Sequence, residues 1–168
     1  AIAERATALT AEHEALGYFL GAWDVDIRLF MSGAPGEEPT TQVSRGTARG
    51  EWVVEDRWLG IALTGEMMGS PYAGYSIRGW DSYAKNWVTA SVTSMDNALN
   101  VTRGVKVDPD GEVSAEYGVL DEYLTGELNK PYRTITRIHD DDRYTSEVWD
   151  MGIGTEGMKV LEFDFTRR

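Results

Sequence analysis

The chain has 168 residues, of which 42% are hydrophobic, enough to bury the core of a single domain that we expect to span residues 1–168. Its 28 acidic and 16 basic residues give a net charge of −12, and no apolar run reaches the length of a membrane-spanning helix, so we expect no nucleic-acid or membrane partner. The chain has no cysteine, which excludes disulfides, a thiolate nucleophile and cysteine-ligated zinc. This composition suits a reducing compartment, and we expect a cytoplasmic protein.

The first predicted element is a short helix over about residues 10–20. Thr10 can cap its N-terminus, and Glu12 and Glu14 favour the positive end of the helix dipole. His13 lies beside these glutamates and is expected to face solvent. One side of the helix is apolar and includes Ala15, Leu16, Phe19 and Leu20.

The sequence after the helix has the two-residue period of β-strands. In "GAWDVDIRLFM" the apolar Trp23 and Val25 alternate with Asp24 and Asp26. We predict ten strands, over residues 21–31, 43–54, 57–68, 72–80, 86–94, 99–107, 112–120, 131–138, 143–151 and 158–166. Turn sequences separate them, of which "DPDG" at 108–111 is the clearest.

The connections between these strands are short, and short connections require antiparallel neighbours. An open sheet of this size would expose two edges, which closure removes. We therefore predict an all-β fold, a closed or nearly closed up-and-down antiparallel barrel of about ten strands with a short N-terminal helix. Gly21 would let the chain turn into the first strand, and Trp23 would fill the narrow end of the barrel.

The segments "LGAWDVDIRLFMSGAPGEEP", "RGTARGEWVVEDRWLGIALTGEMMGSPYAG", "GWDSYAKNWV", "NKPYRTITRIHDDDRYTSEVWDMG" and "MKVLEFDFTR" resemble a bacterial family, the domain of unknown function 1579 family. The resemblance implies a calycin-like (lipocalin-like) barrel and no settled activity. This chain departs from the family pattern at "ASVTSM" (90–95), which lacks a tryptophan and an acid common there, and at Thr134, where a glutamate is common. These departures imply a reshaped pocket.

A barrel of this size can enclose one small ligand. Because the chain has six tryptophans and eight tyrosines, we predict that it binds a small apolar or aromatic metabolite. The predicted ligand-binding residues are Trp23, Tyr75, Trp87, Tyr117, Thr134 and Trp149. The alternative is that most of these aromatic side chains only fill the core or cover sheet faces.

The hairpin over residues 131–151 suggests a second function, that of a cofactor-independent lyase, isomerase or cyclase. If Asp140 and Asp141 form its turn, Thr134 faces Glu147 and Tyr132 faces Trp149. The predicted catalytic residues are Glu147 as acid or base, Tyr132 as proton donor and Arg133 as charge stabiliser. A Glu147 that faces solvent among threonines is the alternative.

The sequence offers few residues or motifs for other recognisable catalytic, metal-binding or cofactor-binding sites. The chain has two histidines, and "HDDD" at 139–142 suits a hairpin turn better than a metal site. It has no phosphate-binding glycine loop and no nucleophile elbow, so we expect no cofactor and no metal. A third hypothesis is an interaction role in which a barrel edge or end joins two copies into a homodimer.

Overall fold

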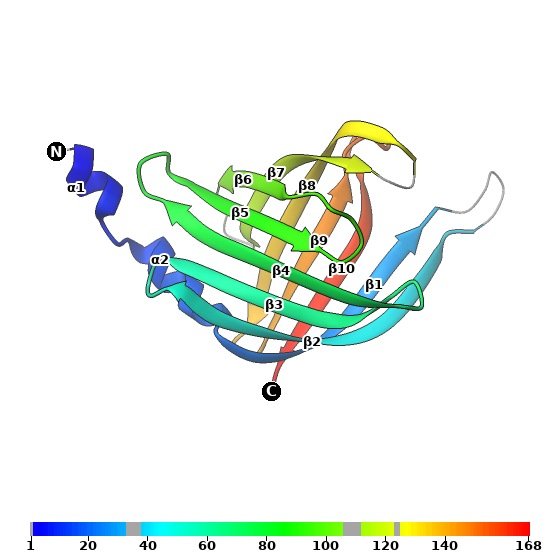
Figure 1. Cartoon of the computed structure of the whole chain (residues 1–168), viewed down its shortest axis with the longest axis horizontal. Coiled ribbons are helices and arrows are strands. Elements are labelled where there is room, and N and C mark those ends of the chain that lie inside the picture. The colour runs from blue at the N-terminus through cyan, green and yellow to red at the C-terminus, as the bar shows by residue number, and fades with distance from the viewer. Residues whose placement is uncertain (1, 33–37, 106–111, 123–124) are drawn as a thin grey trace.

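The computed structural model describes residues 2–32, 38–105, 112–122 and 125–168. The N-terminal part contains helix α1 (Ile2–Thr7), helix α2 (Ala11–Leu16) and the 3₁₀ turn η1 (Gly17–Phe19). Ten strands follow within these residues (Figure 1): β1 (Gly21–Met31), β2 (Thr40–Val54), β3 (Trp58–Met67), β4 (Ser70–Asp81), β5 (Asn86–Thr93), β6 (Asn100–Val105), β7 (Glu112–Glu122), β8 (Glu127–Asp140), β9 (Arg143–Asp150) and β10 (Met158–Arg167).

The strands form a closed antiparallel barrel in which sequential neighbours pair and β10 returns to β1. At the closing seam, Val25 of β1 lies opposite Phe165 of β10. Closure satisfies the backbone hydrogen bonds of both edge strands. The predicted all-β barrel is therefore confirmed, with ten strands at the predicted places. The predicted turn at 108–111 lies outside the described residues.

Two features of the N-terminal part differ from prediction. Helix α1 was not expected, because its six residues show no capping signal or apolar stripe. His13 is buried and not solvated, since α2 packs across one end of the barrel. Its Nδ1 atom accepts a hydrogen bond from the Thr10 amide at 3.1 Å. Burial lowers the pKa of His13 below its ordinary value.

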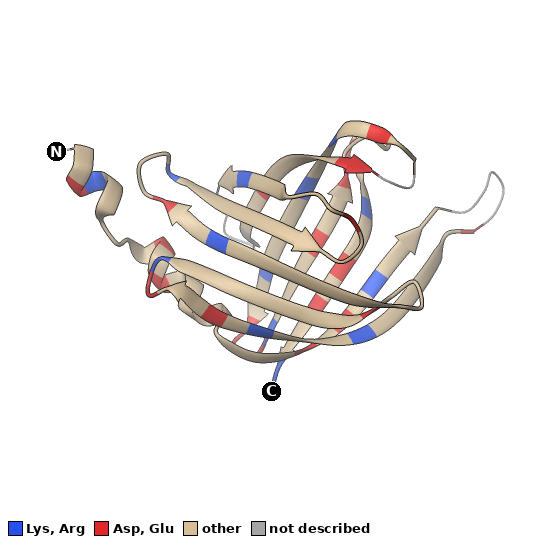
Figure 2. Ribbon diagram, viewed as in Figure 1, with Lys and Arg blue, Asp and Glu red and all other residues tan. Residues whose placement is uncertain are grey.

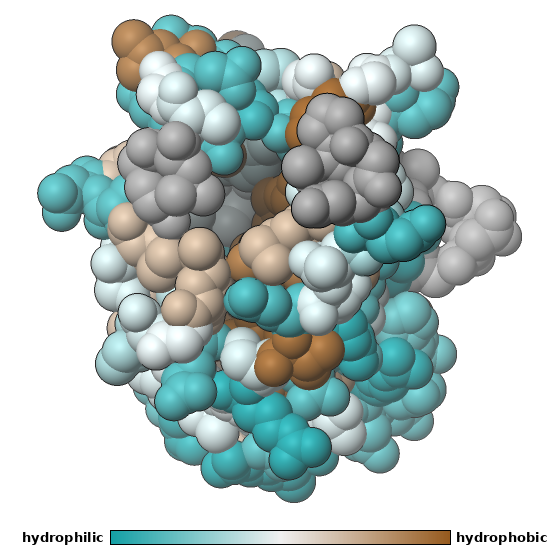
Figure 3. Space-filling view, turned by 90° about the vertical axis from the view of Figure 1, so that its right-hand side faces the viewer, coloured by the Kyte–Doolittle hydropathy of each residue, from teal (hydrophilic) through white to brown (hydrophobic). Residues whose placement is uncertain are grey.

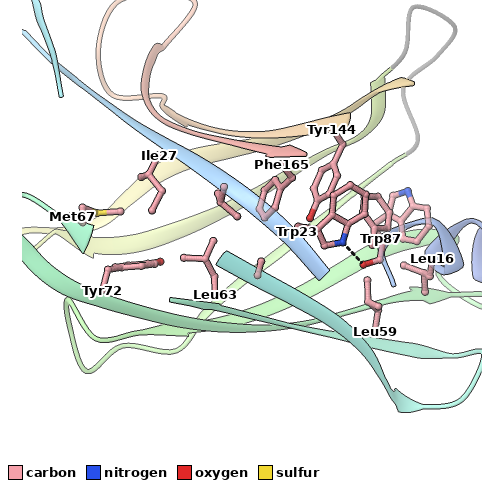
Figure 4. Close-up of a cluster of buried hydrophobic side chains, with 13 residues drawn as sticks. Leu16, Trp23, Ile27, Leu59, Leu63, Met67, Tyr72, Trp87, Tyr144 and Phe165 are labelled. Carbon is pink, nitrogen blue, oxygen red and sulfur yellow. Dashed lines mark hydrogen bonds between the residues drawn. The ribbon is translucent and has the colours of Figure 1, made fainter. Parts of the chain in front are cut away.

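The core extends from the end of the barrel that α2 covers, which we call the closed end, to Met67 and Tyr72 farther along the barrel (Figure 4). Its side chains come from the N-terminal part and from several strands (Figure 4), and include Leu16, Phe19, Trp23, Leu59, Trp87 and Tyr144. The Trp23 indole donates a hydrogen bond to the Phe19 carbonyl at 3.1 Å. This bond joins the first strand to the turn that precedes it.

Two glycines permit this close packing. Gly21 has φ of +100°, a conformation that disfavours any side chain, and it turns the chain from η1 into β1. At Gly50 of β2, an added Cβ would lie 2.0 Å from the carbonyl oxygen of Phe19. A larger residue there would push the N-terminal segment away from the barrel. The glycine before Trp23 thus begins the strand that plugs the closed end.

Candidate ligand cavity

The end of the barrel opposite α2 is hollow, and we call it the open end. A cavity of about 700 Å³ extends from it toward the core. Figure 3 looks onto this end and shows a recess with hydrophobic residues on its inner surface. The strand turns around it include Met68 after β3 and Asp96 after β5.

One side of the cavity is apolar. It is formed by β1, β3 and β10, whose inward positions carry aliphatic and aromatic side chains. They are Leu29, Ile61, Leu63, Leu161, Phe163 and Phe165. We call this side the apolar wall. The Phe163 ring lies 6.4 Å from the ring of Tyr72, which faces it from β4.

The other side, formed by β4 to β9, is rich in hydroxyl groups. We call it the polar wall, and its members include Ser76, Thr89, Ser91, Tyr132, Thr134, Thr136 and Ser146. Hydroxyl groups both donate and accept hydrogen bonds. The polar wall therefore suits neutral oxygen groups on a ligand, whereas the apolar wall suits a hydrocarbon surface.

An ion pair lies deep in the polar wall. Arg78 of β4 and Glu116 of β7 are both almost fully buried, and their Nη2 and Oε1 atoms are 2.9 Å apart. The other Glu116 oxygen accepts a hydrogen bond from Thr102 at 2.8 Å, and Ser114 donates to Oε1 at 3.3 Å. The guanidinium of Arg78 lies 4.7 Å from the centroid of the Trp87 ring. A buried pair needs such partners because its desolvation is costly.

Two polar atoms near this ion pair lack hydrogen-bond partners within the described part of the chain. Among the described residues, Arg78 Nε and the Tyr144 hydroxyl are buried and have no hydrogen-bond partner. Both residues border the inner end of the cavity. Burial raises the pKa of Tyr144 far above its usual value, so the hydroxyl keeps its proton. Both polar atoms are fully buried, so neither is exposed to the cavity itself.

Tyr132 of β8 contributes a further hydroxyl. It lines the cavity, and its ring lies against Gly118, where an added Cβ would come within 3.0 Å of it. Burial, and to a smaller extent the charge of Glu116, raise the pKa of Tyr132 to about 12. Tyr132 is thus a neutral hydrogen-bond donor at ordinary pH.

The open end combines methionines with carboxylates. All six methionines of the chain lie at this end: Met31, Met67, Met68, Met95, Met151 and Met158. Methionine side chains are flexible and adapt to apolar ligands of different shape. Beside them, Lys130 forms ion pairs with Glu122 at 2.5 Å and with Asp150 at 2.6 Å.

The predicted ligand-binding residues separate into three groups. Thr134 lines the cavity. Trp23 and Trp87 are buried in the closed end, where they form part of the core. Tyr75 and Tyr117 are 41% and 53% exposed, with their rings on the outside of the barrel.

Trp149, the remaining predicted ligand-binding residue, lies on the outer face with Arg133. The Arg133 guanidinium is 5.0 Å from the centroid of the Trp149 ring. The Trp149 indole donates to Glu147 at 2.9 Å, and Glu147 also lies 3.4 Å from Lys159. Figure 2 shows charged residues of both signs on the neighbouring strands β9, β10 and β1.

The predicted pairing of β8 with β9 is wrong by one residue. Thr134 lies opposite Val148, and Glu147 lies opposite Ile135. The turn is at residues 141–142, and an irregularity between Ile138 and Asp140 shifts the register. A shift of one residue moves every side chain of a strand to the other face. Glu147 and Tyr132 are therefore on opposite faces, and the predicted acid–base pair does not share a site.

Arg78 and Glu116 were not predicted, although a signal for Arg78 exists. In "PYAGYSIRGW" every second residue from Tyr72 is on the inner face, and Arg78 belongs to that series. On β7 the alternation is ambiguous, because Ser114 and Glu116 alternate with the small Ala115 and with Tyr117. Only the pairing of the strands shows that the glutamate points inward.

The described residues contain neither a membrane-spanning helix nor a cluster suited to a metal ion. None of the helices found there is long and apolar enough to cross a membrane. Over the same ranges, no group of three or more histidine, aspartate or glutamate side chains is arranged to hold a metal ion.

Fold and cavity together define a closed ten-stranded barrel with an internal cavity that opens at one end. The chain belongs to the family described as protein of unknown function (DUF1579), which matches residues 8–167. No curated protein sequence matches it.

The solved structures that are similar to the chain include the following two. The crystal structure of Rv2717c from M. tuberculosis has a TM-score of 0.63 and 13% identity, and the match covers 96% of this chain and 99% of the other. A redesigned β-barrel, b11L5F_LGL, has a TM-score of 0.44 and 12% identity over 92% of this chain and 95% of the other. At 13% identity the similarity to Rv2717c concerns the fold alone. The similarity to the redesigned barrel, with its lower TM-score, supports no conclusion.

Proposed function

We propose that the protein binds a small apolar or aromatic molecule inside the barrel. The observation that carries this proposal is the cavity of about 700 Å³ between the apolar and polar walls. Cavities that bind small ligands typically measure roughly 300–1,000 Å³ and combine an apolar lining with a few polar groups. The methionines at the open end suit an apolar guest that must pass between them.

Binding is better supported than acid–base catalysis. Glu147 lies on the outer face and cannot reach a molecule inside the barrel. Glu116 does lie inside, but Arg78, Thr102 and Ser114 together occupy both of its oxygens. A carboxylate held in this way is a poor acceptor for a substrate proton, since it must first lose one of these bonds.

A titration with the neutral fluorescent dye Nile red tests the proposal. We expect saturable binding of one dye molecule per chain, with the blue shift and rise in fluorescence that an apolar environment produces. Native mass spectrometry with a panel of apolar ligands gives an independent stoichiometry. Absence of binding by both methods would contradict the proposed function.

A pair of substitutions places the bound dye. Ser91→Trp puts an indole into the cavity from the polar wall, and we expect it to abolish dye binding. Val119→Trp adds the same indole at a position of β7 that is 54% exposed on the outer face, and we expect binding to persist. If both variants bind the dye equally well, the dye occupies the surface and not the barrel.

A further inference from the structure

The charges that line the cavity restrict which ligands it can hold. Arg78 is the cation that lies deepest among the described lining residues, and Glu116 already neutralises it at 2.9 Å. A carboxylate bound beside this pair would add a second negative charge, and the described lining residues offer no free cation to balance it. Burial of an unbalanced charge is strongly unfavourable.

The open end opposes anions as well. Lys130 is the second basic residue among the described lining residues, and it is held by Glu122, Glu127 and Asp150. Two further carboxylates, Asp96 and Asp121, border the opening. The whole chain carries a net charge of −12, so long-range electrostatics also repel an approaching anion.

The polar wall nevertheless requires oxygen on the ligand. Tyr132, a neutral donor, lines the cavity, as do Thr134 on the same strand and Ser146 on the paired strand β9. A guest that was hydrocarbon on all sides would leave these donors unpaired.

We infer that the cavity selects uncharged molecules with an apolar ring or chain on one side and carbonyl, ether or hydroxyl oxygens on the other, and that it excludes carboxylates. The inference rests on the proposed function. It names the ligand class through two features: the neutralised Arg78–Glu116 pair and the opposition of the apolar and polar walls.

Competition for bound Nile red tests this inference with three related naphthalenes. Methyl 2-naphthoate carries a neutral ester, 2-naphthoate carries a charge at the same place, and naphthalene has no oxygen. We expect the ester to displace the dye at a concentration at least about tenfold lower than either of the others needs, since each lacks one matching feature. Equal displacement by 2-naphthoate and the ester would overturn the exclusion of anions.

The naphthalene arm tests the polar wall separately. If naphthalene displaces the dye as well as the ester does, the oxygen groups contribute nothing and that half of the inference is wrong. Both results leave the proposed function intact, because the dye itself binds. Failure of the dye to bind contradicts the proposed function instead.

Two variants test the charge argument directly. Glu116→Gln removes the neutralising charge from Arg78, so we expect 2-naphthoate to gain at least about tenfold in affinity relative to the ester. The double variant Arg78→Met/Glu116→Gln has no charge at this place, and we expect the preference for the ester to return. If the single variant shows no gain for 2-naphthoate, the ion pair does not set the selectivity. If that variant does not fold, the comparison of ester and acid on the native protein still decides the inference.

Discussion

The two ends of the barrel are built by the same strands, but side chains fill one and leave the other hollow. At the closed end, Trp23, Trp87 and Tyr144 pack with α2 and η1 (Figure 4). Toward the open end the inward side chains, which include Tyr72 and Phe163, leave a cavity of about 700 Å³ between them. The difference indicates a division of tasks, with stability supplied by the closed end and space for a guest provided by the open end.

The largest effect is expected from a truncation at the closed end. Trp23→Ala removes a fully buried indole, its hydrogen bond to Phe19 and its contact with the Arg167 guanidinium, which lies 4.2 Å from the ring centroid. We expect the free energy of unfolding to fall by roughly 3–5 kcal/mol, as measured by urea denaturation.

The comparison truncation at the open end is Met68→Ala, at a side chain that is 49% exposed. We expect a change within about 0.5 kcal/mol. Similar losses for Trp23→Ala and Met68→Ala would remove the distinction between the two ends.

The ion pair between the two ends should give the next largest effect. Arg78→Met leaves the buried Glu116 carboxylate without its cation, and we expect a loss of about 3 kcal/mol in unfolding free energy. The double variant Arg78→Met/Glu116→Gln should recover most of that loss, because no buried charge remains. If the double variant is as unstable as the single one, the loss reflects packing and not charge.

A smaller effect is expected from Asp164, whose side chain lies on the outer face of β10. Hydrogen bonds from Arg143 at 2.8 and 3.0 Å, and a further one from Arg28, lower the pKa of Asp164. A lowered pKa means that the folded state favours the ionised carboxylate. The stability that ionised Asp164 contributes is therefore fully present above its ordinary pKa of 3.8, and it is lost as the pH falls through the pKa of the folded state.

Asp164→Asn should therefore destabilise the protein by about 1.5 kcal/mol at pH 7 and by much less in acid. Urea unfolding of both proteins across this pH range measures the difference. The control is Asp24→Asn, at an exposed carboxylate paired with Arg168, for which we expect a change of about 0.5 kcal/mol or less. A pH-independent effect of Asp164→Asn would contradict the assignment to charge.

The smallest effect on stability is expected at the polar wall. Thr134→Val replaces a cavity hydroxyl with a methyl group of nearly the same volume, so stability should change by less than about 1 kcal/mol. The affinity for methyl 2-naphthoate should fall severalfold if the hydroxyl contacts the ester. Glu147→Gln, on the outer face, should leave the affinity unchanged. Loss of binding in Glu147→Gln alone would contradict this assignment of the two faces.

The sequence predicted the barrel well because apolar and polar residues alternate strongly along its strands and because short turns join the strands. In β1, for example, Trp23, Val25 and Ile27 are buried, whereas Asp24 between them is exposed. The position of Trp23 at the closed end also follows from the preceding Gly21 and the helix before it.

The candidate site was harder to predict, because it depends on register. Three consecutive aspartates at 140–142 can each take part in a turn, and the structure places the turn one residue later than predicted. The irregularity between Ile138 and Asp140 then shifts the pairing by one residue, which puts Glu147 outside and leaves Tyr132 inside. The Arg78–Glu116 pair joins β4 to β7, and local sequence patterns do not report a contact between strands so far apart in the chain.

The most direct test of the account is a crystal structure of the protein grown with methyl 2-naphthoate. The account predicts density for the ring system against Phe163 and Leu63, with the ester within hydrogen-bonding distance of the Tyr132 hydroxyl. An interior filled by side chains, or a ligand bound only on the outer surface, would contradict it.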